Sequence, residues 1–554
     1  MKRNLDNNIY LFKFLPICFV SLWILFIGVR SIQAQNTSVL PHLRKQGTAT
    51  QLIVHDKPFL MLGGELGNSS ASNLKYMASI WPKLRAMHLN TILVPVYWEL
   101  VEPEEGKFDF TLVDSLVYSA RQHDLKMVIL WFGSWKNSMS CYAPYWVKTN
   151  QERFPRSRTE SGKALEILTP FNNENRNADA KVFANLMKHL RAMDGKENTV
   201  VMVQVENEIG MIPEARDYCA GAEAAFKGEV PVELMAYLRK NKDSLTAELS
   251  QAWHNSGMKT SGTWEEVFGQ SLQTDEIFIA WYFAKYTNDV AEAGKKEYPL
   301  PMYVNAALIR PHYKPGQYPS AGPLPHLMDV WRVAAPQIDF LAPDIYFKNF
   351  AEWLGKYDRA GNAIFIPEVD RRQSVTNAFY AIARHNAMGY NPFSIESAPD
   401  PESNQFNKGY DILRQLTPLI LEHQGKGTMA GFLLDSTSQI AQNKLGGYTF
   451  TVKHEYTWPY AARGEGETPR VGGMIIMVAD DEFYITGSGV VVTFQSSEDD
   501  GTIVGIASMD EGAFVNGKWV AGRRMNGDQD HQGRHMHLPG GEYGIQKVKL
   551  YKYK

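Results

Sequence analysis

The sequence predicts an α/β protein in which a (β/α)8 TIM barrel is followed by a smaller C-terminal all-β sandwich domain. Between about Phe59 and Glu396, eight short apolar runs alternate with amphipathic helical stretches, which is the pattern of parallel βαβ units. Beyond about Gly425, short alternating segments are separated by Gly, Asp and Asn turns, as is typical of a β sandwich. The chain of 554 residues also exceeds one typical domain.

The first 34 residues have the order of a secretory signal peptide. Lys2, Arg3 and Lys13 precede an apolar run from Phe14 to Val29, and small or polar residues follow at positions 31–35. We therefore expect a signal peptide over residues 1–34, export to the periplasm or the extracellular space, and no stable membrane insertion after cleavage. An uncleaved membrane anchor is the alternative.

Few cysteines remain after this segment. Cys18 lies inside the apolar run and lacks the small residues that precede a lipidated cysteine, which leaves Cys141 and Cys219 in the mature chain. An exported compartment permits a disulfide, but two separate thiols are equally ordinary. The sequence leaves open whether the two cysteines pair.

The catalytic barrel is expected to cover residues 35–424. Its eight candidate strands are Phe59–Gly63, Thr91–Tyr97, Met127–Phe132, Val200–Glu206, Met302–Asn305, Phe340–Tyr346, Ile364–Val369 and Pro392–Glu396. Helical patterns lie between them, for example at Leu112–His123 and at Ala180–Met193, the second with Asp179 as a possible N-cap. Eight such units fit a closed barrel better than an open doubly wound sheet.

Two further features concern ligands of the barrel. The glycines at 63–67 have neither dinucleotide-binding nor P-loop spacing, so no cofactor is expected. A long insertion at about 211–300, which includes the helical pattern Ile277–Ala293, follows the fourth strand. Insertions after a barrel strand lie on the active-site face, and we expect this one to shape the substrate cleft.

Residues 425–554 are expected to form the β-sandwich domain. Its candidate strands are Tyr448–Val452, Gly473–Val478, Phe483–Tyr484, Val490–Phe494 and Val548–Tyr553, with turns that include Asn516-Gly517 and Asn526-Gly527. This domain either binds sugar or buttresses the barrel, and we favour the buttress. His531, His535 and His537 have a spacing that a metal could use, but their turn-rich surroundings favour ordinary loop residues.

Composition excludes some partners and favours others. The formal net charge of -3 gives no argument for nucleic acid or an anionic membrane. Aromatic residues make up 12% of the chain, as in many proteins that stack rings on sugars, although a large core explains the same number. Carbohydrate is therefore the expected partner, and the sequence does not predict the oligomeric state.

Acidic residues gather at the expected carboxyl ends of the strands, where catalytic groups of a barrel project. They are Glu65, Glu99, Glu206, Glu208, Asp344, Glu368 and Glu396. Glycoside hydrolysis needs one protonated and one ionised carboxyl group on either side of the scissile bond. A divalent metal site built from oxygen ligands is the alternative, but no histidine of the barrel supports it, and no metal is expected.

Two of these acids are the strongest catalytic candidates. Strand alternation places Glu206 and Glu208 on the same side, so parity cannot choose between them, but Glu208 lies nearer the carboxyl end. The apolar run 364–367 ends in a single acid, Glu368. The pair of Glu208 and Glu368 rests on their joint placement at the ends of the fourth and seventh strands.

Two segments resemble a known family. Residues 204–210, Gln-Val-Glu-Asn-Glu-Ile-Gly, are similar to the Q-x-E-N-E-x-G signature of β-galactosidases in glycoside hydrolase family 35. Residues 98–110 resemble the W-x-x-x-E-P-x-x-G-x-[FY]-x-F run of that family after the second strand. The resemblance covers the barrel. It implies a retaining β-galactosidase in which Glu208 is the acid/base and Glu368 the nucleophile.

The same resemblance assigns neighbouring residues. Asn207 would hold the 2-hydroxyl of the sugar, and Tyr346 resembles the strand-six tyrosine that orients the nucleophile. Two departures mark a diverged branch with some likeness to family 42. Residues 133–135 read Gly-Ser-Trp where the family has A-E-W, and residues 367–370 lack the usual S-E-[FY]. The catalytic class carries over more securely than the preference for galactose.

Further residues near the strand ends are candidates for substrate binding. They are Tyr97, Glu99, Trp131, Trp135 and Glu396, with Trp98 and Phe393 as additional ring platforms, although core packing and rim ion pairs explain such residues comparably well. The sequence thus predicts a retaining exo-β-glycosidase that releases terminal β-galactose from plant-type oligosaccharides or polysaccharides. Two alternatives stay open, namely another specificity such as arabinosidase or glucosidase, and a catalytically silent polysaccharide-binding protein.

Overall fold

The computed structural model describes residues 39–359, 361–371, 375–399, 401, 404–457, 468–498 and 501–554. The predicted signal peptide and Cys18 lie outside these residues. Within them, none of the helices combines the length and the apolar character that crossing a bilayer requires. The described part of residues 38–554 is one compact unit.

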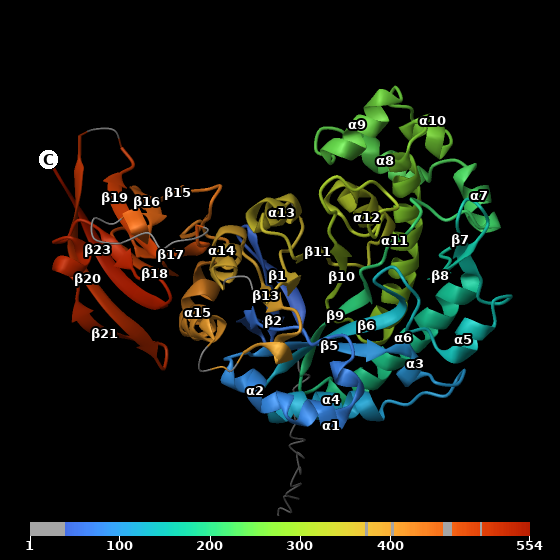
Figure 1. Cartoon of the computed structure of the whole chain (residues 1–554), viewed down its shortest axis with the longest axis horizontal. Coiled ribbons are helices and arrows are strands. Elements are labelled where there is room, and N and C mark those ends of the chain that lie inside the picture. Colours follow the sequence, from blue (N-terminus) through green and yellow to red (C-terminus); the bar gives the residue numbers. More distant parts are fainter. Residues whose placement is uncertain are drawn as a thin grey trace, which may run out of the picture. The chain divides into compact units, whose positions relative to one another are not determined.

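A parallel eight-stranded sheet forms the barrel and confirms the predicted fold class (Figure 1). Its strands lie in the order β4-β13-β12-β11-β10-β9-β6-β5. Bridges from Glu65 to Leu93 and to Phe393 join the two ends of the sheet, and the Leu93 N–H donates to the Gly64 carbonyl at 2.9 Å. The bounds are β4 Met61–Leu62, β5 Thr91–Tyr97, β6 Lys126–Lys136, β9 Val200–Asn207, β10 Met302–Ala307, β11 Phe340–Ile345, β12 Ile366–Val369 and β13 Gly389–Pro392.

Amphipathic helices cover the outside of the barrel strands. In α4, for example, Val113, Leu116, Val117 and Ala120 are buried, which is the spacing of one helical face. The helices are α1 Leu74–Ala78, α2 Ile80–Ala86, α3 Trp98–Val101, α4 Thr111–Gln122, α5 Tyr145–Thr149, α6 Asn173–Asp194, α7 Ala220–Phe226, α8 Val232–Lys240, α9 Ala247–Asn255, α10 Trp264–Phe268, α11 Leu272–Glu297, α12 Met328–Ala334, α13 Phe350–Tyr357, α14 Thr376–His385 and α15 Gln405–His423.

Two expectations about helices need correction. Asp179 is not an N-cap, because α6 begins two turns earlier, where the Asn172 side chain accepts a hydrogen bond from the Asn175 N–H. The long helix α11 packs along α6 as the outer helix of the fourth βα unit. The inserted part of the predicted 211–300 segment is therefore residues 211–271, which contain α7 to α10.

Two barrel strands are also displaced from their expected positions. The run Phe59–Gly63 divides, because Phe59 ends β3 (Lys57–Phe59) of a separate sheet and only Met61–Leu62 join the barrel. The eighth strand is Gly389–Pro392 rather than Pro392–Glu396. Ser394 has φ +53°, which ends the extended backbone, and a 3-10 turn follows at Ile395–Ser397.

The sequence did not reveal the small sheet before the barrel. The strands β1 His42–Gln46, β2 Ala49–Val54 and β3 Lys57–Phe59 form an antiparallel meander. His55 and Asp56, at φ +49° and +62°, make the two-residue turn between β2 and β3. The pair His55-Asp56 lacks the Asn-Gly signature by which such a turn can be predicted from a sequence.

The C-terminal region consists of two antiparallel sheets, as expected (Figure 1). One has the order β14-β17-β18-β23-β20-β21 and the other β15-β16-β19-β22, and side chains from both, such as Ile485 and Phe450, share one buried core. Asn516 and Gly517 form the turn between β20 and β21 with φ +50° and +73°. The bounds are β14 Met429–Leu434, β15 Ile440–Leu445, β16 Tyr448–His454, β17 Val471–Ala479, β18 Glu482–Ser488, β19 Val490–Ser496, β20 Ile503–Val515, β21 Lys518–Arg524, β22 Met536–Leu538 and β23 Gly544–Tyr553.

The six-stranded sheet packs on the barrel. Met474 and Ile476 of β17 are buried in the same hydrophobic core as the barrel helices, and the Phe514 N–H donates to Gln415 Oε1 of α15 at 3.0 Å. These contacts fit a buttressing role, which stays a prediction, as does the domain boundary at Gly425.

Candidate active site

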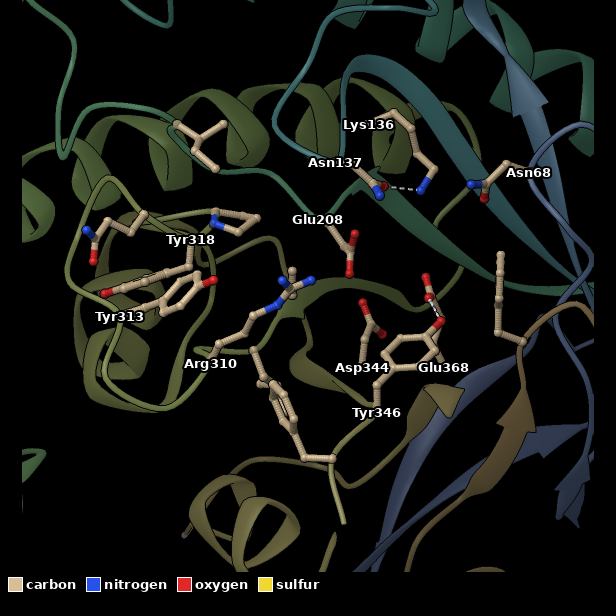
Figure 2. A pocket seen from close by; sticks show the side chains of 17 residues that line it. Asn68, Lys136, Asn137, Glu208, Arg310, Tyr313, Tyr318, Asp344, Tyr346 and Glu368 are labelled. Carbon is tan, nitrogen blue, oxygen red and sulfur yellow. Dashed lines mark hydrogen bonds between the residues drawn. The ribbon is translucent and has the colours of Figure 1, made fainter. Parts of the chain in front are cut away.

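A pocket of about 560 Å³ opens at the carboxyl ends of the barrel strands (Figure 2). Its floor contains three buried acids, Glu208 after β9, Asp344 of β11 and Glu368 of β12. The register of the parallel strands places Asp344 directly beside Glu368. These are the ends at which barrel enzymes carry their catalytic groups.

Glu368 is held by two neighbours. The Tyr346 hydroxyl donates to Glu368 Oε2 at 2.5 Å, and Asn207 Nδ2 approaches Oε1 at 3.5 Å. Burial and the charge of Glu368 keep the pKa of Tyr346 far above its ordinary value, so this hydroxyl stays protonated and donates at every physiological pH. The tyrosine after the sixth strand, which was expected beside the nucleophile, and the asparagine at the end of the fourth strand thus both contact the acid of the seventh strand.

The surroundings of Glu208 raise the pKa of its carboxyl group into the neutral range. Its side chain faces the pocket, and its backbone N–H donates to Asn305 Oδ1 at 3.0 Å, which fixes the end of β9. Burial and the negative charge of Glu368 raise the pKa of Glu208 to about 7, whereas Lys136 acts in the opposite direction. A carboxyl group that is half protonated at neutral pH is suited to general acid/base chemistry.

Two more buried acids, Asp344 and Glu65, are affected by the negative charges of Glu368 and Glu208. Burial, together with the charges of Glu368 and Glu208, raises the pKa of Asp344 well above its ordinary value, and Asn305 Nδ2 donates to Asp344 Oδ2 at 2.7 Å. Glu65, which is fully buried, has its pKa raised for the same reasons. The negative charges of the floor thus oppose ionisation of both carboxyl groups.

The acids of the floor also meet the geometric demands of a cation site. One carboxylate oxygen each from Glu208, Asp344 and Glu368 lies within 4.8 Å of the others. Oxygen ligands of this kind are those that Mg²⁺ and Ca²⁺ prefer. The raised pKa of Asp344 and of Glu208 means, however, that protons compete with a cation for two of the three carboxyl groups.

The structure distinguishes between the two glutamates that strand parity left equivalent. Glu206 and Glu208 both have left-handed backbone, with φ +61° and +44°, so the alternation of β9 breaks at its end. Glu206 accepts the Trp135 N–H at 2.7 Å, and burial and the charge of Asp179 raise its pKa well above the ordinary value. Glu208 is therefore the member of the pair that reaches the pocket.

Lys136 and Asn137 are pocket residues that sequence reasoning missed. The third strand was expected to end at Phe132, but β6 continues for four more residues to Lys136. The Asn137 N–H donates to the Asn207 carbonyl at 3.2 Å, which holds this extension against the end of β9. Lys136 is charged, does not end an apolar run and belongs to no motif. No feature of the sequence therefore indicated that it lines the pocket.

Gly133 makes this extension possible. A methyl group there would lie 2.3 Å from Trp131 Nε1, 2.8 Å from Asp179 Oδ1 and 2.9 Å from Glu206 Oε1, all in a closely packed interior. We expect Gly133→Ala, which introduces the residue typical of family 35, to lower the free energy of unfolding by about 1–3 kcal/mol through overpacking. Thermal and urea unfolding measure the effect.

Gly355→Ala is the matched control. Gly355 lies exposed in α13, and no atom comes within 4 Å of an added methyl group, so the higher helix propensity of alanine should leave stability unchanged or raise it by up to about 1 kcal/mol. Equal unfolding midpoints for Gly133→Ala and the parent protein would show that the interior relaxes around the new methyl group.

Three predicted ring platforms lie in the interior instead of the pocket wall. Trp131 is fully buried and donates through Nε1 to Asp179 at 2.9 Å. Trp135 packs edge-on against Phe283 and Tyr286. Tyr97 is 2% exposed and donates to the Asn68 carbonyl at 2.7 Å.

Of the remaining predicted contacts, Phe393 alone is among the described residues that line the pocket. Glu99 forms an ion pair with Lys148 at 3.5 Å, and Trp98 is buried. Glu396 accepts the Ser70 hydroxyl at 2.6 Å. None of these lines the pocket as the structure describes it, whereas Phe393 does.

The cysteines and the C-terminal histidines lie elsewhere. Cys141 and Cys219 are both free thiols. The rings of His531 and His535 stack at a centroid distance of 5.3 Å, and His537 Nε2 is 3.5 Å from Glu455.

Comparison with known proteins gives two matching family models. Residues 51–274 match the glycosyl hydrolases family 35, and residues 406–537 match a domain of unknown function, DUF5597. Glu208 lies inside the first range and Glu368 beyond it. A β-galactosidase of Xanthomonas manihotis is 28% identical over 200 residues, which are 34% of this chain and 29% of that protein. The chain thus spans less than a third of the curated relative that it matches.

Solved structures with similar folds include two β-galactosidases. The enzyme of Bacillus circulans sp. alkalophilus is 14% identical, with 66% of this chain and 57% of that chain covered and a TM-score of 0.46. A family 42 β-galactosidase of G. stearothermophilus is 10% identical, with 88% and 98% covered and a TM-score of 0.46.

Proposed function

We propose that the protein is a retaining exo-β-glycosidase with β-galactosidase activity, and the match of residues 51–274 to the glycosyl hydrolases family 35 supports this proposal. Glu208 is the acid/base and Glu368 the nucleophile. The observation that carries the proposal is the meeting of these two buried acids on the pocket floor, with carboxylate oxygens within 4.8 Å of each other.

The separation of the acids supports retention of configuration. Retaining enzymes hold their two carboxyl groups about 5–5.5 Å apart, whereas inverting enzymes leave about 6.5–9.5 Å for a water molecule between the acid and the sugar. One carboxylate oxygen of Glu208 lies within 4.8 Å of one of Glu368, which is closer to the separation in retaining enzymes than to that in inverting enzymes. A pocket closed by these acids also suits removal of a terminal sugar.

The two steps of the reaction follow from the charges of the pair. Glu368 attacks the anomeric carbon while Glu208 gives its proton to the departing glycosidic oxygen. Formation of the glycosyl ester neutralises Glu368, which removes the charge that raises the pKa of Glu208. Glu208 then accepts a proton from the water that hydrolyses the ester and is restored to its starting state.

The pH dependence follows with a definite sign. Glu208 must be protonated to act as an acid, so kcat/KM should fall as the pH rises through about 7. Lys136 lowers the pKa of Glu208, and Lys136→Met should therefore move this alkaline limb to higher pH. The measurement is kcat/KM against pH, which reports the free enzyme.

Lys148→Met serves as the control for this prediction. Lys148 is paired with Glu99 and does not line the pocket, so its loss should leave the alkaline limb in place. A limb that stays fixed in Lys136→Met, or moves to lower pH, would contradict the assignment of Glu208 as the titrating acid.

The sugar specificity is tested with nitrophenyl β-glycosides of galactose, arabinose and glucose. The proposal expects turnover of the galactoside. Turnover of another sugar would keep the acid pair and discard the galactose preference. If the parent binds glycan without turning over any β-glycoside, the catalytically silent alternative replaces the proposal.

The biological setting is a separate proposal. The basic, apolar and small-residue order of positions 1–34 supports export to the periplasm or the extracellular space. Side chains of plant-type polysaccharides are the proposed source of the terminal galactose. Detection of the mature N-terminus at Gln35 in the exported fraction tests the first of these statements.

A further inference from the structure

The pocket wall beyond the acid pair is firmly anchored. It is formed by residues 308–321, which follow β10. Met211 and Ser320 exchange backbone hydrogen bonds of 2.9 and 3.1 Å, so this wall is tied to the segment after β9. The buried Glu276 of α11 accepts the Tyr318 hydroxyl at 2.8 Å. Side chains on the wall are thus presented from a fixed backbone.

Arg310 stands on this wall and extends into the pocket. Figure 2 shows its guanidinium directed toward Glu208, with Tyr313 and Tyr318 on the same side and Glu368 and Tyr346 on the other. In the described part of the chain, the guanidinium of Arg310 takes part in no hydrogen bond or ion pair with a protein group.

Several other arginines of the described residues form ion pairs with acids. Arg216 contacts Glu223 at 2.6 Å and Asp275 at 3.0 Å. The wall around Arg310 offers no such partner. Its described residues are apolar, aromatic or uncharged, namely Ile212, Leu308, Tyr313, Gln317, Tyr318, Pro319 and Phe347. The positive charge of Arg310 therefore faces the pocket, and none of these wall residues carries a carboxylate that could neutralise it.

The position of this charge relative to the scissile bond follows from the proposed roles of the acids. The general acid faces the leaving oxygen, so the side of Glu208 remote from Glu368 borders the leaving group. Arg310 lies on that side (Figure 2). A ligand of Arg310 thus belongs to the part of the substrate that departs.

We propose that Arg310 binds an anionic group on the leaving-group sugar, so that the preferred substrate is a β-galactosyl residue attached to an acidic sugar. This inference rests on the proposed function. A guanidinium binds planar oxyanions through two parallel hydrogen bonds, and the half-exposed ring of Tyr313 provides a face for the sugar. A uronic acid carboxylate and a sulfate ester share this chemistry.

The test compares three β-galactosyl disaccharides that differ only at one position of the leaving sugar, which carries a carboxylate, the reduced primary alcohol or a sulfate ester. For the full-length parent, kcat/KM should be highest for a charged disaccharide. Arg310→Gln should lower kcat/KM for that substrate by about 10- to 100-fold, the value of a charge-assisted hydrogen bond, and for the alcohol by less than threefold. The better of the two charged substrates identifies the anion.

Two controls separate the possible failures. Lys314→Gln removes a positive charge from the same loop but not from the pocket lining, and it should preserve the preference for the charged disaccharide. Nitrophenyl β-galactoside carries no acidic sugar, so its hydrolysis by the parent tests the proposed function independently of any preference for a charged disaccharide.

The outcomes are distinct. If nitrophenyl β-galactoside and all three disaccharides remain intact, the proposed function fails. If the galactoside is hydrolysed but the parent shows no preference for a charged disaccharide, the inference about Arg310 is overturned and the proposed function stands. Equal losses for charged and neutral disaccharides in Arg310→Gln overturn it as well.

Discussion

Replacing Glu368 by alanine is expected to lower kcat on β-galactosides by about 10⁴-fold or more. The side chain is the nucleophile of the proposed first step, and Asp344 and Glu65 are poor substitutes for it, because burial and neighbouring charges raise the pKa of both. Steady-state hydrolysis of nitrophenyl β-galactoside measures the loss.

Chemical rescue distinguishes a lost nucleophile from a lost fold. Azide is small enough to enter the space left in Glu368→Ala and to attack the anomeric carbon from the same side. The expected product is the α-galactosyl azide, with inverted configuration. Glu105→Gln removes a surface carboxylate paired with Arg153 and should retain full activity. Residual activity within tenfold of the parent in Glu368→Ala would exclude this residue as the nucleophile.

Replacing Glu208 by alanine is expected to cost about 10²–10⁴-fold, with a size that depends on the leaving group. A disaccharide needs its departing oxygen protonated, so its hydrolysis should suffer most. A dinitrophenolate leaves without a proton, so the first step should be nearly unaffected. The measurement is kcat/KM for a series of aryl β-galactosides and for one disaccharide.

The dependence on the leaving group is the decisive part of this result. A steep dependence in Glu208→Ala, set against a shallow one in the parent, identifies the proton donor. Azide should restore turnover of activated substrates as the β-galactosyl azide, with retained configuration, since Glu368 is intact. A uniform loss across all leaving groups would mean that Glu208 acts by shaping the pocket and not by proton transfer.

Much of the fold could be predicted from hydrophobic periodicity. Interior strands such as Thr91–Tyr97 have continuous apolar runs and were located with their bounds. Short edges of the barrel were harder, because Met61–Leu62 pairs over two residues and adjoins another sheet. The eighth strand was displaced because Ile395, which continues the apolar pattern, lies in a 3-10 turn that follows the left-handed Ser394.

The candidate site was predictable where chemistry follows directly from a strand end. Glu208 and Glu368 lie on the pocket floor, and Asn207 and Tyr346 lie beside Glu368. Strand parity alone could not separate Glu208 from Glu206, because two left-handed residues break the alternation there. The roles of these side chains remain proposals until they are measured.

Other parts of the site depend on tertiary packing that a single sequence does not specify. Trp131 and Trp135 lie just before the pocket residue Lys136 in the sequence. The side chains of both tryptophans are nevertheless buried in the interior, and the extension of β6 brings Lys136 to the pocket. Arg310 reaches the pocket from a loop that is held in place by the backbone pairing of Met211 with Ser320 and by the hydrogen bond from Tyr318 to Glu276. Neither Lys136 nor Arg310 belongs to a sequence motif, so their positions in the pocket could be found only from the structure.

Proton NMR of the first sugar released from a β-galactoside tests the central claim most directly. A retaining enzyme with Glu368 as nucleophile and Glu208 as acid/base forms β-galactose first, and the α anomer then grows in by mutarotation. Initial release of the α anomer would mean inversion by direct attack of water, which would contradict a covalent intermediate on Glu368.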